Sequence, residues 1–255
     1  MPASLFSRFF AARSSAPSPG LASDRMWSWL PSQCALCKAW PTRPVCETCI
    51  TAFAQPAHRC LSCALRIPEG IERCGACLLH TPPWQVGLAA VSYQWPWAEA
   101  MAQFKYRAQP GWASTMASLM HSAPGVDDAL AQAQWVLPMP LSPERLAQRG
   151  FNQSLLLARH LSPAQTRYNV LLRIRDTPAQ RTLPRSERLR NLQGAFAVDP
   201  MQAAALRGQS VVLVDDVMTT GASLHMAALA LRAAGVAHLT TVVFARTEAH
   251  AQDDL

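Results

Sequence analysis

The eight cysteines of the chain form four Cys-x-x-Cys pairs, all between positions 34 and 77. The pairs are Cys34/Cys37, Cys46/Cys49, Cys60/Cys63 and Cys74/Cys77. Two residues between cysteines let both thiolates of a pair turn toward one metal ion, and two pairs complete the four-sulfur tetrahedron that zinc prefers. The spacing therefore predicts two structural zinc ions (Zn2+).

The cysteine pattern leaves alternatives open. Sequential pairing would place the first two pairs on one ion and the last two on the other. In a crossed pairing, each ion would instead bind one of the first two pairs and one of the last two. An even number of cysteines also permits a disulfide framework, which is typical of secreted chains, while the rest of this sequence is typical of the cytosol. Four thiolates can also hold an iron–sulfur cluster. A closed four-sulfur zinc site has no open position for catalysis, so the pattern predicts a fold rather than a reaction.

A second chemical pattern occupies residues 211–223, Val-Val-Leu-Val-Asp-Asp-Val-Met-Thr-Thr-Gly-Ala-Ser. The aliphatic run 211–214 predicts a strand that is buried on both faces, and the apolar run 224–234 predicts a helix. The carboxylates of Asp215 and Asp216 come where we expect that strand to end. The turn before the helix, named the phosphate loop below, consists of Thr219, Thr220, Gly221, Ala222 and Ser223.

A strand, a hydroxyl-rich loop and a helix together point backbone N–H groups and a helix N-terminus at a phosphate. Gly221 permits close approach of the backbone, and the hydroxyls add donors. Asp215 and Asp216 cannot bind the phosphate, since like charges repel, but they suit sugar hydroxyls or a hydrated Mg2+. The alternative is an ordinary strand–turn–helix with a polar surface turn.

The charge of the chain is concentrated in its middle. The chain has 23 Lys+Arg and 16 Asp+Glu, a net charge of +7, and residues 144–190 alone hold ten arginines and three acids, also +7. Arginine suits bidentate phosphate contacts, so an anionic partner is expected near this segment, although solvated arginines would leave the same pattern. No apolar run is long enough for a membrane-spanning helix, so we expect no stable membrane insertion.

Within this basic segment, residues 135–141 predict a strand that ends in a proline-bounded turn. Arg145, Arg149 and Gly150 follow in an expected basic loop, and residues 154–161 predict a helix. The end of a strand, a basic loop and a helix again form a geometry that receives anions.

Segment 211–223 resembles, at every position, the 5-phosphoribosyl-1-pyrophosphate (PRPP) signature of type I phosphoribosyltransferases. Further motifs are similar to the ComF family over residues 31–247. They are the Cys-x-x-Cys pairs, Phe104-Lys105-Tyr106, Pro138-Met139-Pro140-Leu141, Arg149-Gly150-Phe151-Asn152-Gln153, Gln180, Arg188, Asn191 and Gly194-Ala195-Phe196.

The resemblance implies an α/β fold with a type I phosphoribosyltransferase-like parallel sheet flanked by helices and a small N-terminal zinc-ribbon domain. The expected organisation is a disordered tail at 1–30, a double zinc ribbon at 31–80, the transferase-like domain at 85–247 and a tail at 248–255. It also implies a cytoplasmic protein of natural transformation that binds PRPP with Mg2+. Such a protein would handle incoming single-stranded DNA beside other DNA-uptake proteins.

The resemblance also assigns roles for pentosyl transfer, in which a nucleophile displaces pyrophosphate from the anomeric carbon of the ribose. The phosphate loop would hold the 5-phosphate, and Asp215 and Asp216 the ribose hydroxyls and Mg2+. The remaining candidates are Arg145, Arg149 and Arg188 for the pyrophosphate, and Phe104, Lys105 and Tyr106 for the hood that selects the acceptor. Two rival hypotheses are a non-catalytic factor that senses PRPP or binds DNA, and a phosphoribosyltransferase of nucleotide metabolism unrelated to DNA uptake.

Overall fold

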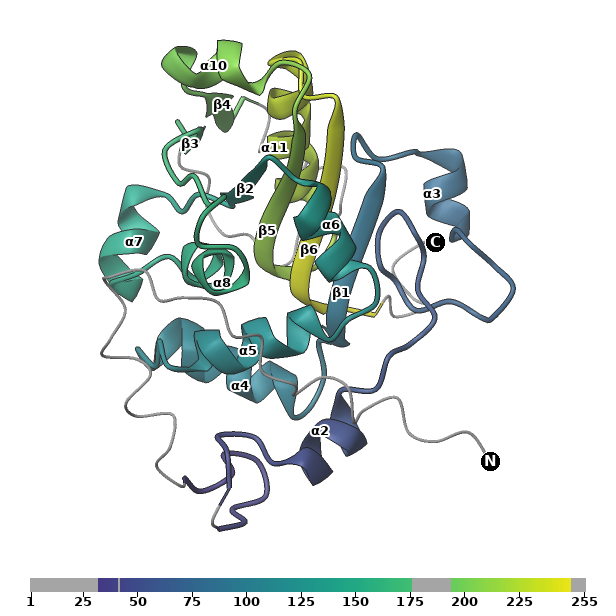
Figure 1. The fold of residues 1–255 in the computed structure, drawn as a ribbon, viewed down its shortest axis with the longest axis vertical. Helices are drawn as coiled ribbons and strands as arrows, with labels where there is room; N and C mark the ends of the chain where they lie inside the picture. Colours follow the sequence, from purple (N-terminus) through teal and green to yellow (C-terminus); the bar gives the residue numbers. More distant parts are fainter. Residues whose placement is uncertain (1–31, 41, 176–193, 249–255) are drawn as a thin grey trace. The chain divides into compact units, whose positions relative to one another are not determined.

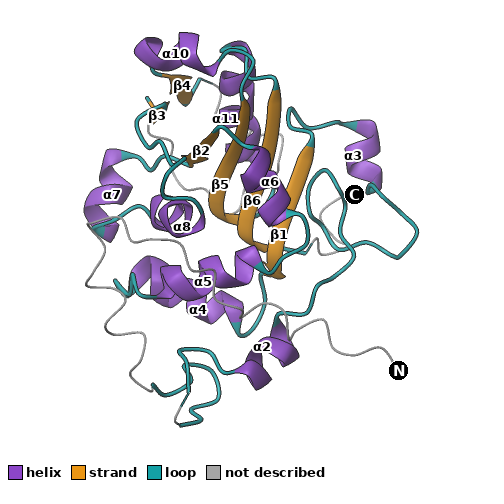
Figure 2. Ribbon diagram, in the orientation of Figure 1, coloured by secondary structure: helices purple, strands orange, loops and turns teal. Residues whose placement is uncertain are grey.

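A four-stranded parallel sheet forms the core of the unit Val45–Leu255 (Figures 1 and 2). The computed structural model describes residues 32–40, 42–175 and 194–248. The strands are β1 (Val86–Ser92), β2 (Trp135–Pro138), β5 (Ser210–Met218) and β6 (His238–Arg246), in the order β1-β6-β5-β2. β5 and β6 are central and consist largely of aliphatic residues that are buried on both faces, as a parallel sheet requires.

The register brings the carboxyl ends of the strands to one edge of the sheet. On β5, Val211 is paired with Leu239 of β6, and the ladder continues to Met218 and Arg246. β5 is therefore longer than the strand expected from residues 211–214, and the prediction that Asp215 and Asp216 follow its end was wrong. Both carboxylates lie within the strand, because backbone pairing with β6 continues past them.

Helices cover both faces of this sheet. α4 (Trp97–Tyr106), α5 (Trp112–His121), α6 (Val126–Gln132) and α8 (Gln153–Leu161) lie on one face, and α11 (Ala222–Ala233) lies on the other (Figure 2). Leu213 and Val243 share a buried cluster with Leu224 and Leu231 of α11. The expectation of a parallel sheet flanked by helices is confirmed.

A short helix replaces the basic loop expected after β2. α7 (Pro143–Arg149) carries Arg145 and Arg149, so the prediction that these residues lie in a loop was wrong. The Oγ of Ser142 accepts a hydrogen bond from the backbone N–H of Arg145, and Pro143 occupies the first turn. An N-cap serine followed by proline favours helix formation, and Gly150 ends the helix with φ 76°.

Smaller elements complete the described chain. β3 (Leu171–Arg173) and β4 (Phe196–Val198) form an antiparallel pair, followed by α10 (Pro200–Leu206). Among the described residues, none of the helices has both the length and the apolar character that a membrane crossing requires.

The cysteine-bearing part of the chain contains α2 (Glu47–Phe53) and α3 (Gly75–Leu79). The contacts divide the chain into two units, Met1–Pro44 and Val45–Leu255, so the three later cysteine pairs belong to the same unit as the sheet. The boundaries proposed from the sequence stay predictions. The expected tail at 1–30, most of the tail at 248–255 and the arginines at 181, 185, 188 and 190 lie outside the described residues.

Candidate functional site

The centre of the candidate site is the pair of carboxylates on β5. The Lys105 Nζ lies 2.7 Å from the Asp216 Oδ1, and both side chains are largely buried. The Ser154 hydroxyl donates a hydrogen bond of 2.9 Å to the Asp215 Oδ1, which also accepts one from the backbone N–H of Asp216. Three distant segments, from α4, α8 and β5, therefore meet at two adjacent carboxylates.

The surroundings raise the proton affinity of Asp215. Burial is the main cause, and the neighbouring charge of Asp216 adds to it, so the pKa of Asp215 rises from 3.8 to about 7. Lys105 and the hydrogen bonds from Asp216 and Ser154 act in the opposite direction. Two close carboxylates that resist ionising together suit a site where a cation joins them.

Residues from the hood and from the basic segment contact one another, and they are sequence neighbours of Lys105 and Ser154. The guanidinium of Arg149 lies 5.4 Å from the ring centre of Tyr106 and donates a 3.0 Å hydrogen bond to the Gln153 Oε1. The rings of Phe104 and Phe151 pack with centres 5.6 Å apart. Tyr106, predicted for the hood, therefore lies against Arg149, which is predicted to bind the pyrophosphate.

The phosphate loop follows at the carboxyl end of β5. Gly221 has φ 74° and is the N-cap of α11, and no side chain caps this helix. The first N–H groups of a helix have no partner within it, so those at the start of α11 can receive an anion. Thr219 is exposed, while Thr220 and Ser223 are partly exposed. The loop thus offers backbone and hydroxyl donors beside two carboxylates.

The other pyrophosphate candidates are less well placed. Among the described residues, the side chain of Arg145 makes no hydrogen bond or ion pair, although its backbone N–H donates to the capping Oγ of Ser142. Arg188 lies outside the described residues. These assignments stay predictions.

The structure adds three residues to the site that sequence reasoning did not select. They are Ser154, which holds Asp215, Gln153, which holds Arg149, and Arg246 at the end of β6. Gln153 is fully buried, and its Nε2 makes no hydrogen bond within the described chain. Gln153 is the last residue of the motif that begins at Arg149, and Ser154 follows it. This motif was the sequence signal that could have pointed to both residues. Arg246 had only a weak signal, a charge that ends an apolar strand.

The last four cysteines form one group, Cys60, Cys63, Cys74 and Cys77, with sulfurs within 4.8 Å of one another. The sulfurs of Cys63 and Cys74 are 3.7 Å apart, close to the edge of about 3.8 Å in a tetrahedron with zinc–sulfur bonds of 2.3 Å. The backbone N–H of Cys74 points at the Cys60 sulfur, 3.3 Å away. We name these residues the second cysteine group.

Electrostatics within the second cysteine group favour a cation. Burial and the neighbouring thiols raise the pKa of Cys63 to about 11. Burial also acts to raise the pKa of Cys60, but hydrogen bonds from the N–H groups of Cys74, Cys63 and Ser62 outweigh it and bring this pKa to about 7. Four thiols in such a space can all ionise only when a positive ion compensates their charges.

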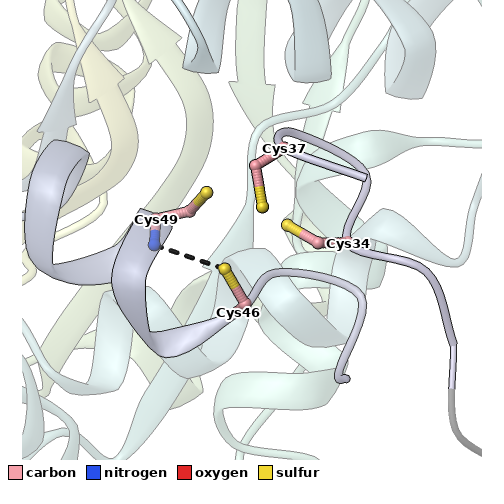
Figure 3. Close-up of side chains that lie close together, drawn as sticks. All are labelled: Cys34, Cys37, Cys46 and Cys49. Atoms are coloured by element: carbon pink, nitrogen blue, oxygen red, sulfur yellow. Dashed lines mark hydrogen bonds between the residues drawn. The ribbon is translucent and has the colours of Figure 1, made fainter. Parts of the chain in front are cut away.

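The first four cysteines form the other group (Figure 3). The side chains of Cys34, Cys37, Cys46 and Cys49 point toward a common centre, and the Cys49 N–H is directed at the Cys46 sulfur. The grouping is therefore sequential in both cases, and none of the eight cysteines is in a disulfide. The residues of both groups fit a structural zinc ion.

Comparison with known proteins agrees with this geometry. Residues 171–254 match the model of the phosphoribosyl transferase domain family. The "DNA utilization protein YhgH" of Escherichia coli K12 is 30% identical over 230 residues, covering 86% of this chain and 98% of the relative.

Two relatives carry competence names. "Competence protein F" of Haemophilus influenzae is 30% identical over 209 residues, covering 79% of this chain and 88% of the relative. "Competence protein ComFC" of Bacillus subtilis is 34% identical over 111 residues, covering 42% and 43%. Because the similarity covers most of this chain and most of these relatives, and the transferase domain and both cysteine groups are present, the chain belongs to the ComF family.

Proposed function

We propose that this chain binds PRPP with Mg2+ at the phosphate loop and acts in the uptake or use of DNA. One observation carries the proposal: the loop that can receive a phosphate follows the end of the strand that bears Asp215 and Asp216, and Lys105 reaches Asp216 from a distant helix. A phosphate acceptor, a pair of hard oxygen ligands and a buried cation at one sheet edge match the parts of a sugar pyrophosphate.

Each part of PRPP has a proposed binding group. The N–H groups at the start of α11 and the hydroxyls of Thr219, Thr220 and Ser223 bind the 5-phosphate. Asp215 and Asp216 accept hydrogen bonds from the ribose hydroxyls or hold Mg2+, which supplies positive charge against the pyrophosphate. Arg149 is held in place by Tyr106 and Gln153, so its guanidinium can meet the pyrophosphate without a large loss of entropy.

Pentosyl transfer would follow if an acceptor enters between the hood and the ribose. The bond from the acceptor to the anomeric carbon forms, the bond from that carbon to the pyrophosphate oxygen breaks, and pyrophosphate leaves with the electron pair. The acceptor's proton is released to solvent. Arg149 and Lys105 favour this step by stabilising negative charge near the leaving group. Release of pyrophosphate, measured with the wild-type protein and candidate acceptors, separates a transferase from a factor that only binds PRPP.

The proposed role in DNA metabolism, which we place in the cytoplasm, draws on relatives named for DNA utilization and competence. One surface feature favours single-stranded DNA. Arg159 lies 5.9 Å from the ring centre of Tyr168, and the Arg149–Tyr106 pair is similar. Tyr106 and Tyr168 are 60% and 62% exposed. Exposed arginine–aromatic pairs can contact the phosphates and stack on the bases of a flexible strand.

Calorimetry of the zinc-loaded full chain tests the PRPP site. We expect heat of binding with PRPP and Mg2+ and weaker binding of ribose 5-phosphate, which keeps the contacts of the 5-phosphate but lacks those of the pyrophosphate. Replacing both Asp215 and Asp216 by Asn should abolish PRPP binding. The matched control replaces Asp127 and Asp128 of α6, an exposed pair of adjacent aspartates, by Asn and should leave it unchanged. Absence of heat with wild-type protein would overturn the proposal.

Oligo(dT) binding tests the DNA role separately. The Asp215→Asn/Asp216→Asn variant should still bind oligo(dT) if the DNA surface extends beyond the PRPP site. If PRPP displaces oligo(dT) from wild-type protein, one site serves both anions. If wild-type protein binds no oligo(dT) with or without PRPP, the DNA-handling part of the proposal fails.

A further inference from the structure

Arg246 joins the second cysteine group to the phosphate loop. It ends β6 and is 9% exposed, so its guanidinium is almost completely removed from solvent. Its Nε donates a 2.8 Å hydrogen bond to the carbonyl of Cys63, while its Nη1 donates to the carbonyls of Met218 and Thr219. Cys63 belongs to the second cysteine group, Met218 ends β5 and Thr219 begins the phosphate loop. One side chain therefore holds both segments.

Trp84 makes a second connection between the same two segments. It is 5% exposed, and its Nε1 donates a hydrogen bond to the carbonyl of Ser62, between Cys60 and Cys63. Its ring faces His225 in the first turn of α11 edge-on, with ring centres 6.3 Å apart. A Cβ added at Gly221 would lie 3.9 Å from this ring. The tryptophan thus packs beneath the phosphate loop while it binds the cysteine turn.

The turn between Cys60 and Cys63 is also fixed against the sheet. The N–H of Gly87 on β1 donates a 2.8 Å hydrogen bond to the carbonyl of Leu61. A Cβ at Gly87 would approach the Ser62 carbonyl oxygen to 2.4 Å, so only glycine permits this contact. Because the turn from Cys60 to Cys63 packs against the backbone of β1, a change in the conformation of this turn must also move the side chains that bind it, Arg246 and Trp84.

We propose that the metal-bound second cysteine group sets the position of the phosphate loop, with Arg246 as the positioning residue that couples the two sites. The metal fixes the turn from Cys60 to Cys63 and hence the carbonyl to which Arg246 donates. Arg246 in turn fixes the carbonyls of Met218 and Thr219, and through them the N–H groups that bind the phosphate. This inference rests on the proposed PRPP function.

The coupling works in both directions, since the effect of one bound ligand on another is reciprocal. Metal in the second cysteine group favours the loop conformation that binds PRPP. Bound PRPP, by holding the loop, keeps Arg246 on the Cys63 carbonyl and slows loss of the metal. The first cysteine group shares none of these contacts among the described residues and serves as an internal reference.

Metal release from the wild-type protein tests the coupling without any substitution. The full chain loaded with zinc is mixed with a coloured chelator, and release is followed with and without PRPP and Mg2+. We expect two kinetic phases, of which PRPP slows one by about tenfold, as a coupling of ordinary size would do. Ribose in place of PRPP should have no effect.

Two arginine variants separate positioning from general stability. Arg246→Lys keeps the charge but cannot reach both segments, so PRPP affinity should fall by about tenfold and PRPP should no longer slow zinc release. The matched control is Arg232→Lys. Arg232 also donates to three backbone carbonyls, those of Pro83, Val236 and Ala237, but none belongs to the phosphate loop. The Arg232→Lys variant should lose about as much stability as Arg246→Lys, but PRPP should still slow its zinc release.

A third variant keeps the test decisive if Arg246→Lys does not fold. Trp84→Phe keeps an aromatic ring, although a smaller one, but removes the donor to Ser62, and it should weaken the effect of PRPP on zinc release. If wild-type protein fails to bind PRPP, the proposed function and this inference both fail. If it binds PRPP but neither zinc phase slows, or both slow equally, only this inference is overturned.

Discussion

Lys105 is one of two lysines in the chain, and its side chain forms the buried ion pair with Asp216. Lys105→Gln leaves two neighbouring carboxylates without their cation, so we expect a loss of about 2 kcal/mol in unfolding free energy at pH 8. Millimolar Mg2+ should recover part of this loss, because it supplies the missing positive charge. Thermal unfolding with and without Mg2+ measures both effects.

The control for this prediction is Lys105→Arg, which keeps the charge and should respond to Mg2+ as the wild-type protein does. Equal stabilisation of wild type and Lys105→Gln by Mg2+ would show that the metal does not bind at these carboxylates. Residue patterns could not reveal this ion pair, since its partners lie on separate elements and only the packing of α4 on the sheet joins them.

Asp215 makes stability depend on pH. Its pKa is about 7 in the folded chain against 3.8 as the reference value, so the folded state binds the proton more tightly than the unfolded state. Stability should therefore fall as pH rises from about 4 to about 7 and then level off. Asp215→Asn removes the ionisation, and its unfolding free energy should change less between these pH values.

Urea unfolding at pH 5 and pH 8 checks this expectation. Asp128→Asn, an exposed position on α6, is the matched control and should keep the pH dependence of the wild-type protein. If the unfolding free energy of Asp215→Asn depends on pH as strongly as that of the wild-type protein, the pKa of Asp215 is not raised in the folded chain.

At the scale of elements, the phosphate loop depends on a left-handed residue. Gly221 has φ 74°, and Gly208, remote from the loop, has φ 73°. An alanine at either position should cost about 1 kcal/mol in stability, because a Cβ disfavours this conformation. Only Gly221→Ala should also weaken PRPP binding, since it changes the direction of the first N–H groups of α11. Thermal unfolding and calorimetry of the two variants decide this, and equal PRPP affinities would argue against phosphate binding by the loop.

The elements show where sequence patterns succeed and where they fail. The aliphatic run before Asp215 correctly predicts a buried parallel strand, because three of its four residues are β-branched valines, which favour a strand over a helix. The same pattern predicts that the strand ends at Val214, because aspartates are rare in strands. The strand in fact continues to Met218, because its backbone stays paired with β6. For α7, the signal was present as Ser142 followed by Pro143, but the glycine and arginines nearby favoured a loop. The family and the fold class were confirmed, whereas the roles of the site residues stay predictions.

At the scale of the whole molecule, the structure groups the cysteines sequentially. Their spacing alone had left the crossed grouping open as well. It did not indicate that the second group is bound to the sheet through the backbone of Gly87 and the side chain of Arg246. The contact between Arg246 and Cys63 joins residues 183 positions apart in sequence, and no local pattern carries that information.

The concentrated positive charge of residues 144–190 leads to a prediction for the complete chain. If its arginines contact DNA phosphates, the logarithm of the oligo(dT) association constant should fall linearly with the logarithm of salt concentration, since each contact releases counterions. Arg149→Gln and Arg159→Gln should each reduce the slope by about 0.7, the value for one phosphate on a single strand. Arg207→Gln, an exposed arginine outside this segment, should leave the slope unchanged. Fluorescence anisotropy of labelled oligo(dT) at several salt concentrations measures the slopes. If the oligo(dT) affinity of the wild-type protein does not depend on salt, the arginines of residues 144–190 do not contact DNA phosphates, because such contacts always weaken as salt concentration rises. The positive charge would then bind PRPP alone.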